Sequence, residues 1–434
     1  VFGVMLGAGA ATLRMFFLVA GLSDWIACSE STQRRTQARV VGAIGSWGDD
    51  TLRRLGRTIA HHELTPLLDE TWKCLMILVA MDAPSGFILG EKRAASRDGD
   101  AWNEVLKATF KHLKVRVLQV VADEARGISN YVRGLLGAHR ASDLFHGLHD
   151  LGAAVGAQHR KRSAAQATVR AAVRGAKREA QALVRRLQAR IEVVTGRQRE
   201  ASDAFHPFEL RTGSAVSVEA LRARLEHAVA RVEHAAIESE VSTRVIARIE
   251  KAQRVDPVVV RNLAWWQRLV ARTLAAEHLS EQLLVATREM VFPLRYLGSV
   301  RARAARSERG RVDDALGTLR ARQTSASVWS TQPAAVRTRQ EATAVWLASH
   351  FVRASSGVEG TRVLSLRYHQ RRALPPALLK ALMVIHNYVL RRADGTTAAE
   401  RFFAARHDDL FEHLLSVVAD SHGLVAAHDR RSRP

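Results

Sequence analysis

Three carboxylates in this chain are notable for the residues around them. Asp69 and Asp123 each follow a short apolar run and each precede a glutamate, in LLDET and VADEA. Glu359 is the one acid in SSGVEGTRVLSLRYHQRRAL (355–374), where every other charge is basic. An acid that ends a buried strand is costly unless it is exposed at the sheet edge or paired with a cation. Because carboxylate oxygens are the ligands that Mg²⁺ prefers, the three residues predict a metal site if the fold brings them together.

The chemistry of such a site would be phosphodiester cleavage. Two Mg²⁺ ions held about 3.5–4 Å apart can clamp the attacking and leaving oxygens of an in-line displacement, and Mn²⁺ is a suitable substitute. Each acid alone has a simpler interpretation. An Asp-Glu pair at a strand end is typical of a solvated turn, and a glutamate near a helix start is typical of a cap or a helix-dipole partner.

The composition indicates a polyanion as partner. The chain has 434 residues, enough for two or three domains, a hydrophobic fraction of 47%, a net charge of +22 and a pI of about 11.1. This charge favours nucleic acid first and an acidic membrane second, and the excess of arginine suits bidentate phosphate contacts. The two cysteines, Cys28 and Cys74, form no metal-binding or CxxC spacing, so we expect a reducing, cytoplasmic setting.

The N-terminal region reads as two helices separated at Gly21. Its first, apolar part predicts a buried helix in preference to a signal peptide or a membrane span. The second helix carries several arginines, which allows either a helix-turn-helix or two packed helices with a solvated basic face. GSWGDD (45–50) interrupts the helical pattern and predicts a boundary.

Residues 63–150 change to an α/β pattern. Apolar runs alternate with helical spacing, and the Pro-Ser-Gly turn after the second run predicts that the first strands pair antiparallel. Asp100 is the expected cap of the first helix. The expected strands are 64–72, 74–86, 87–94 and 115–125, and the expected helices are 98–113 and 126–139.

Residues 152–350 are expected to be almost wholly helical. An apolar stripe from Val169 to Val194 predicts one amphipathic helix, and a second is expected from Val218 to Lys251. The arginines off the first stripe are candidates for contacts with a DNA backbone. Trp265 and Trp266 could stack on a flipped base, although packing between helices is the more usual role. The DNA-contact candidates on the first helix are Arg170, Arg174, Arg185 and Arg186.

Two stretches resemble the DDE transposases of bacterial insertion sequences. The first runs from LLDETW through VVADEARG to SDLFHGLHDL, and the second from SSGVEGTRVL to ADGTTAAERFF. The resemblance covers residues 60–150 and 350–404. It implies an α/β, RNase H-like core with a large all-helical insertion and a helical N-terminal domain, in a chain that is mainly α overall.

The resemblance also implies the site and the domains. Asp69, Asp123 and Glu359 become the catalytic, metal-binding acids with two Mg²⁺ ions, and Asp143 and His146 become auxiliary residues. The implied activity is metal-dependent DNA strand cleavage and strand transfer, on element ends and target DNA, in the bacterial cytoplasm. The resemblance implies no membrane partner and allows a homodimer on DNA. The expected domains are 1–58, 59–152, 153–350 and 351–434, and the DNA contacts near the last acid are Arg362, Arg367, Arg371 and Arg372.

One departure from the family pattern leaves alternatives open. The Val-Glu-Gly motif is commonly followed by Arg-Asn-Gly, whereas Thr361, Arg362 and Val363 follow Gly360 in this chain. This difference, with the absence of an initial methionine, leaves open a truncated or decayed copy. The alternatives are a non-catalytic DNA-binding protein derived from a transposase and a helical interaction protein without a nucleic-acid role.

Overall fold

The computed structural model describes most of the chain in two compact units. The first unit comprises the described residues of 1–140 and 355–434, and the second those of 141–354. The described residues are 8–421 apart from 24, 27–28, 60–61, 73–75, 123–124, 143, 172–173, 254–255, 305, 307–308 and 354–373.

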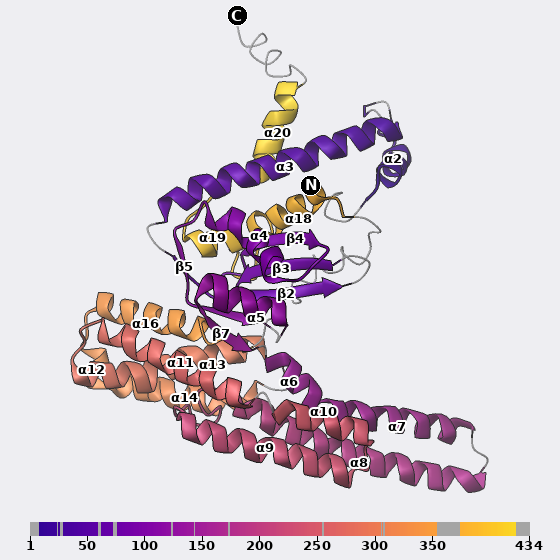
Figure 1. Ribbon diagram of the computed structural model, residues 1–434, viewed down its shortest axis with the longest axis vertical. Coiled ribbons are helices and arrows are strands. Elements are labelled where there is room, and N and C mark those ends of the chain that lie inside the picture. The colour runs from indigo at the N-terminus through magenta and orange to yellow at the C-terminus, as the bar shows by residue number, and fades with distance from the viewer. Residues whose placement is uncertain are drawn as a thin grey trace, which may run out of the picture. The chain divides into compact units, whose positions relative to one another are not determined.

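A mixed five-stranded sheet organises the first unit (Figure 1). Its strand order is β4-β3-β2-β6-β7, with β2–β3 and β3–β4 antiparallel and β2–β6 parallel. The antiparallel pairing expected from the Pro-Ser-Gly turn is confirmed. The sheet strands are β2 (Pro66–Trp72), β3 (Met76–Asp82), β4 (Ile88–Ala94), β6 (Gln119–Ala122) and β7 (His139–Ser142), and a separate parallel pair joins β1 (His62–Leu64) to β5 (Val115–Val117).

Three details of this region differ from the sequence expectations. The strand expected over 115–125 is split into β5 and β6, and β7 was not expected because its sequence, HRAS, contains no apolar run. The helix α4 (Gly99–Phe110) is capped by Asp98, whose side chain accepts the Ala101 N–H at 2.9 Å, and not by Asp100. The remaining helical segment before β7 is α5 (Arg126–Tyr131) followed by the π-helical turn η1 (Val132–Leu136).

The C-terminal helices complete the first unit by holding the β3–β4 hairpin. Asn387 of α18 (Pro376–Tyr388) accepts the Ile88 N–H at 2.8 Å and donates to the Ile88 carbonyl at 3.0 Å, which pairs the free edge of β4. His386 lies 2.9 Å from the Gly86 carbonyl. His386 and Asn387 therefore have a structural role in holding α18 against the β3–β4 hairpin. Helices α19 (Ala398–Phe403) and α20 (Leu410–Ser421) follow.

The expected boundary at residues 45–50 is wrong, because α3 runs unbroken from Glu30 to Thr58. The glycines in this stretch serve a close helix contact. A Cβ on Gly48 would lie 2.3 Å from a methyl group of Val384 in α18, so only glycine allows the two helices to approach this far. Glycine inside a helix therefore indicated close packing here and not a helix end.

The first helix, α2 (Ala10–Val19), is not buried as expected. Met15, Phe16 and Val19 are exposed, and Ala10 is its one buried residue. No helix among the described residues is both long and apolar enough to cross a membrane.

The second unit is helical throughout. It contains α6 (Leu144–Leu151), α7 (Ala153–Ala171), α8 (Arg174–Ala204), α9 (Val218–Glu238), α10 (Thr243–Gln253), α11 (Asp256–Ala275), α12 (Glu281–Ala286), η2 (Thr287–Val291), α13 (Phe292–Arg303), α14 (Gly310–Ser325), α15 (Ser327–Ser330) and α16 (Ala334–Ser349). Two expected helices are each divided in two. The stripe over 169–194 is shared by α7 and α8, and α9 ends at Glu238 before α10 begins.

An aromatic cluster forms part of the core of this unit. Trp266 is 3% exposed, stacks on Phe292 at a ring distance of 5.1 Å and donates its indole N–H to the Leu347 carbonyl at 3.0 Å. Phe208 meets both rings edge-on. The packing role of Trp266 is therefore confirmed, and its ring is not available to stack on a base.

Candidate metal centre and nucleic-acid interface

Asp69 lies within β2, in the middle of the sheet. Asp69 is half-buried, and its Oδ1 accepts a hydrogen bond from the Glu70 N–H at 2.8 Å. The strand continues for three residues beyond it to Trp72, so the aspartate lies within the strand rather than at its end. The pairing of Asp69 with Val79 of β3 fixes its backbone in the ladder on that side.

The parallel pairing of β2 with β6 extends to the residues that directly precede the two aspartates in the sequence. Leu67 pairs with Val121 and Leu68 with Ala122. Asp69 is the next residue of β2, and Asp123 directly follows the last residue of β6 in the sequence. The two strands are therefore neighbours, as the sequence predicted, although Asp123 itself lies outside the described residues.

Glu70 faces away from Asp69, as alternation along a strand requires. Its carboxylate is 7% exposed and pairs with Arg97 at 2.9 Å. In the ladder Glu70 shares a row with Leu78 and Lys92, and Lys92 pairs with Glu104 of α4. This face of the sheet is thus the one that α4 covers.

A second acid, missed in the sequence, lies on the same face as Asp69. Asp69 pairs with Val79 of β3, and Val79 pairs with Glu91 of β4, so the three residues form one row across the sheet. Neighbouring strands lie about 4.8 Å apart, which separates the Asp69 and Glu91 backbones by about 10 Å. The signal available in the sequence was a charged residue in the middle of a predicted strand, in ILGEKRA.

The carboxyl group of Glu91 is unusual in its surroundings. Part of the residue reaches the surface, yet both carboxylate oxygens are buried, and neither has a hydrogen-bond partner among the residues that the structure describes. Burial raises the pKa of the Glu91 carboxyl to about 8. Because the charged form is not compensated, the group keeps its proton at neutral pH.

Asp82, at the end of β3, is a buried acid of a different kind. Burial raises the pKa of its carboxyl to about 6, although hydrogen bonds from the Ser85 hydroxyl and N–H oppose the shift. The Ser85 N–H lies 3.1 Å from Oδ2. This geometry closes the turn between β3 and β4, so Asp82 has a structural role.

Most of the other predicted site residues cannot be placed. His146 lies in α6 and Arg174 begins α8, but their side chains are outside the described residues. Within the described part of the chain, no group of three or more His, Cys, Asp or Glu side chains is arranged to hold a metal ion. The predictions that lie wholly outside the described residues are Asp123, Asp143, Glu359, Arg362, Arg367, Arg371 and Arg372.

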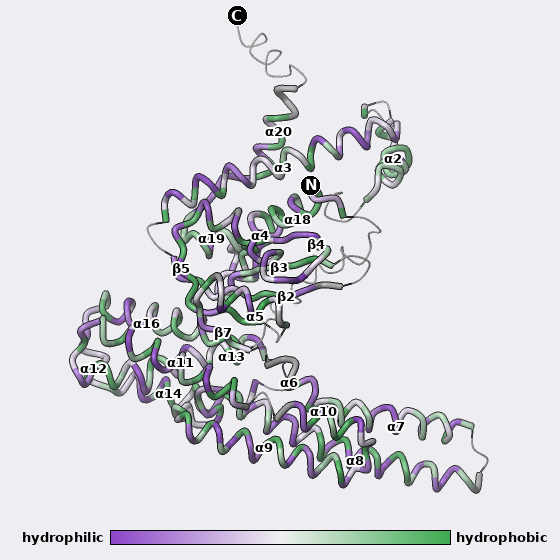
Figure 2. The backbone as a smooth tube through the Cα atoms, in the orientation of Figure 1, coloured by the Kyte–Doolittle hydropathy of each residue, from purple (hydrophilic) through white to green (hydrophobic). Residues whose placement is uncertain are grey.

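The antiparallel pair α7–α8, which we call the basic hairpin (residues 153–204), carries a large excess of positive charge. Between residues 160 and 190 it has ten Arg or Lys and one acid, Glu179. Hydrophilic and hydrophobic residues alternate along both helices (Figure 2). The hydrophobic residues form the seam between the helices and include Leu187 and Ile191, each at most 5% exposed.

The outward arginines of the basic hairpin are available to a partner. Arg170, Arg185 and Arg186 are exposed, and none of the three forms an ion pair with another described residue. Arg190, closer to the body of the unit, pairs with Glu240 at 3.1 Å. Unpaired guanidinium groups on two packed helices are suited to phosphate contacts.

A comparison with known protein families matches the C-terminal third of the chain. Residues 287–431 match a family of unknown function (DUF6399), which covers about a third of the chain. Glu359 lies inside this segment, whereas Asp69 and the basic hairpin lie outside it. No curated protein matches the chain.

Proposed function

We propose that this protein is a DDE-type transposase that cleaves DNA at the ends of an insertion sequence and transfers the freed strand to target DNA. The observation that carries the proposal is the parallel pairing of β2 with β6 through Leu68 and Ala122, the residues that directly precede Asp69 and Asp123. Two acids at adjacent positions of neighbouring strands are what a divalent metal site acting on a phosphodiester needs.

The architecture supports the same proposal. The strands β2, β3 and β4 pair antiparallel in turn, and β6 pairs parallel with β2. The resulting strand order, β4-β3-β2-β6-β7, is that of an RNase H-like core. The helical residues 141–354 lie between this sheet and Glu359 in the sequence, as in a transposase with a large insertion before its last acid.

The donor chemistry at Asp69 fits Mg²⁺. A half-buried carboxylate that accepts one backbone N–H provides a hard oxygen ligand of fixed orientation. When bound, two Mg²⁺ ions would neutralise charge on the oxygens of the phosphodiester. Asp69, Asp123 and Glu359 are the proposed ligands, and Mn²⁺ is expected to replace Mg²⁺.

The protein's own contribution is positioning and charge. The backbone N–H of Glu70 orients the Asp69 carboxylate, and the β-ladder prevents it from moving with the phosphate. The metal ions that Asp69, Asp123 and Glu359 would hold bind the scissile phosphate, and the exposed arginines of the basic hairpin bind duplex DNA. Water attacks the phosphodiester at the element end and displaces the 3′-oxygen as a free 3′-hydroxyl. This hydroxyl then attacks a target phosphodiester in line and displaces the 3′-oxygen of the target strand, without a covalent protein intermediate.

The decisive experiment compares Asp69→Asn with Glu70→Gln. Both changes remove one charge and keep the shape, but Glu70 faces the opposite side of the sheet. DNA flanking the coding sequence is incubated with each protein and Mg²⁺ or Mn²⁺, and nicking is measured. We expect Asp69→Asn to lose at least about a thousandfold in rate because it removes charge from the metal site, whereas Glu70→Gln keeps activity. DNA binding should survive in both variants.

A second candidate function rests on the basic hairpin alone. Its unpaired arginines would bind duplex DNA whether or not the acids cleave it, which favours a non-catalytic DNA-binding protein derived from a transposase. Wild-type protein that binds DNA but never nicks it with either metal would establish this candidate and reject the enzyme.

A further inference from the structure

Helix α2 is apolar on every side. Arg14 is the one charged residue in its sequence, AATLRMFFLV, and Figure 2 shows the helix as hydrophobic over most of its length. Ala10 is buried and Leu13 and Phe17 are half-buried, so this side of the helix packs against α3. A helix that is hydrophobic all round is normally covered all round, whereas α2 is covered on one side.

The uncovered side of α2 is a continuous apolar face, which we call the α2 face. Its members are Met15, Phe16, Leu18 and Val19. At 100° per residue these four exposed side chains fall within an arc of about 160° around the helix axis, with Arg14 at its border. Together with the exposed Trp25 they present on the order of 600 Å² of apolar surface. The largest apolar patch of a typical monomer covers about 300–600 Å², so the α2 face is at the upper limit for a surface that stays in water.

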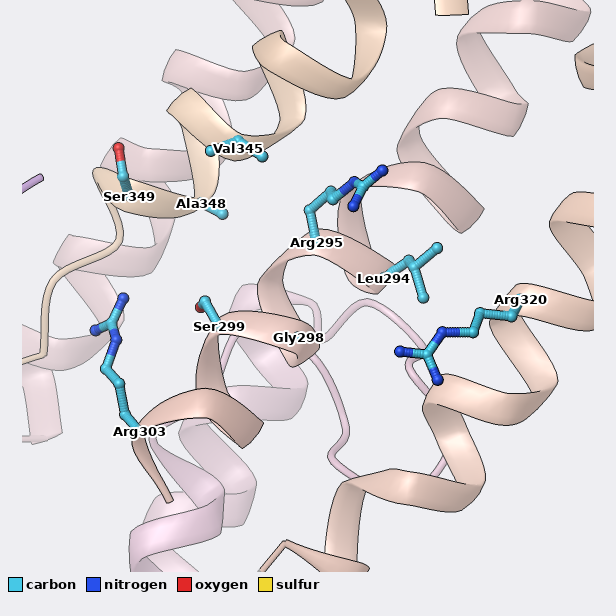
Figure 3. Close-up of a pocket in the computed structure, with 9 residues that line it drawn as sticks. All are labelled: Leu294, Arg295, Gly298, Ser299, Arg303, Arg320, Val345, Ala348 and Ser349. Carbon is cyan, nitrogen blue, oxygen red and sulfur yellow. The ribbon is translucent and has the colours of Figure 1, made fainter. Parts of the chain in front are cut away.

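Two other exposed apolar side chains of the described chain lie beside charged groups. Val345 of α16 shares the wall of a pocket with Arg295 and Arg320 (Figure 3). Phe411 of α20 is followed by Glu412, which lines a second pocket. An apolar partner on either surface would bury charge, which is costly, whereas an apolar partner on the α2 face would bury none.

We propose that α2 of one copy of this chain packs against α2 of a second copy, and that the resulting two-fold dimer forms without DNA. A two-fold axis brings the same face of both copies together, so a face without charged residues is complementary to itself. Two α2 faces, with Trp25 of each copy, would bury about 1,200 Å² in total, the lower end of the range for specific interfaces. We therefore expect a dimer of moderate affinity, with a dissociation constant on the order of 10 µM.

The composition of α2 favours a second copy over a lipid surface. An interfacial membrane helix carries lysines and arginines on a strongly polar face opposite its apolar face. The side of α2 opposite the α2 face is apolar and packs on α3, and Arg14 is the one charge of the helix. Helix α2 thus lacks the polar face that keeps such helices at the surface of a membrane, whereas a second copy supplies an apolar face of equal size.

Sedimentation velocity of nuclease-treated protein without DNA measures the dimer. Between about 1 and 100 µM the mean mass should rise from 47.9 kDa toward twice that value. Each copy carries a net charge of +22, so raising NaCl from about 0.1 to 0.5 M should strengthen the dimer by screening the repulsion. Association through residual nucleic acid would instead weaken as salt rises. A monomer at every concentration, or an association that salt weakens, would overturn the proposal.

Two matched double variants test the surface itself. Phe16→Glu with Val19→Glu places charges in the interface and should weaken the dimer at least about a hundredfold. Phe411→Glu with Leu415→Glu changes the net charge equally, and Phe411 is 59% exposed, as Phe16 is, but both control residues lie on α20. The control should leave the dissociation constant unchanged, and an equal loss in both variants would overturn the α2 interface. Circular dichroism checks that both variants are folded.

Crosslinking locates the two-fold axis. Met15 lies near the middle of the α2 face, so the two Met15 positions should lie close together in the dimer. In a background with Cys28 and Cys74 replaced by Ser, Met15→Cys should be joined to its copy by a bismaleimide that spans packed helices, whose axes lie about 8–10 Å apart. Phe411→Cys is equally accessible and should not be joined. Equal yields at the two positions would overturn the proposed axis.

Vesicle flotation tests the lipid alternative. If the protein is monomeric in solution but binds vesicles that contain phosphatidylserine, and Phe16→Glu with Val19→Glu abolishes that binding, the α2 face belongs to a lipid surface and the dimer is wrong. The dimer does not rest on the proposed function. Asp69→Asn should dimerise as the wild type does, and a protein that dimerises through α2 but never nicks DNA would reject the enzyme and retain the interface.

Discussion

The two units of this protein handle charge in opposite ways. In the sheet unit, acids are placed inside: Asp82 and Glu91 are buried, and burial raises the pKa of both carboxyls. In the helical unit, cations are placed outside: Arg170, Arg185 and Arg186 of the basic hairpin are exposed. A buried acid must lose its charge or find a cation, whereas an exposed arginine stays charged and attracts a polyanion from a distance.

The difference also appears in how helices pack. Helix α3 contacts α18 at Gly48, where a Cβ would overlap Val384. The two residues are more than three hundred positions apart in the sequence. The basic hairpin joins α7 to α8, which are neighbours in the sequence, through small and branched side chains such as Ala180 and Leu187. The sheet unit thus depends on a few close, long-range contacts, and the hairpin on many local ones.

The largest expected effect tests the exposed cations. Replacing Arg170, Arg174, Arg185 and Arg186 by Glu should weaken duplex DNA binding on the order of a thousandfold at low salt, because four phosphate contacts become repulsive. The log–log salt slope should fall by about 3–4. Anisotropy titrations at several salt concentrations measure both quantities.

The matched control carries the same change of charge elsewhere in the unit. Arg244, Arg261, Arg268 and Arg272 are exposed residues of α10 and α11, and their replacement by Glu makes an equal difference in net charge. If the control weakens binding as much as the hairpin variant does, net charge and not the hairpin is responsible.

The next effect concerns the close contact of α3. Gly48→Ala should lower the free energy of unfolding by about 1–3 kcal/mol, because the new methyl group overlaps Val384. Urea denaturation of the sheet unit's transition measures the change.

Gly196→Ala in α8 is the opposite case. Nothing lies within 4 Å of a Cβ there, so alanine should raise the free energy of unfolding by about 0.5–1 kcal/mol through its higher helix propensity. If Gly48→Ala and Gly196→Ala changed the free energy of unfolding in the same direction, the proposed difference in helix packing between the two units would be wrong.

The smallest expected effect is the pH dependence of stability that the buried carboxyl of Glu91 causes. The pKa of the Glu91 carboxyl is about 8 in the folded protein, against an ordinary value of 4.5. Between these values the folded state keeps a proton that the unfolded state releases, so the free energy of unfolding falls as pH rises through the window. From about pH 6.5 to 9, above the pKa of about 6 for Asp82, the loss should be about 2 kcal/mol.

Glu91→Gln should abolish most of this pH dependence, because the amide has no proton to lose. Glu104→Gln, which changes an exposed acid of α4, is the control and should leave the dependence as in the wild type. Chemical denaturation at about pH 6.5 and pH 9 measures the free energy of unfolding of each variant at both ends of the range. If the free energy of unfolding of Glu91→Gln depends on pH as strongly as that of the wild type, another group titrates in this pH range.

Local pattern in the sequence was enough to predict most of the elements. The β3–β4 hairpin followed from apolar runs around a Pro-Ser-Gly turn, and α4 and α5 followed from the helical spacing of residues 98–113 and 126–139. Alternation along β2 also placed Asp69 and Glu70 on opposite faces. These features depend on residues close in the sequence, so periodicity and turn chemistry suffice to specify them.

Tertiary contacts decided the rest. Gly48 was interpreted as part of a boundary because the helix that requires a glycine there, α18, lies more than three hundred residues later in the chain. Glu91 read as an ordinary strand acid because its shared row with Asp69 exists only once β2, β3 and β4 pair in register. Local pattern fixes which face a residue takes on its own element, but burial, register and close approach depend on what the rest of the chain brings to that face.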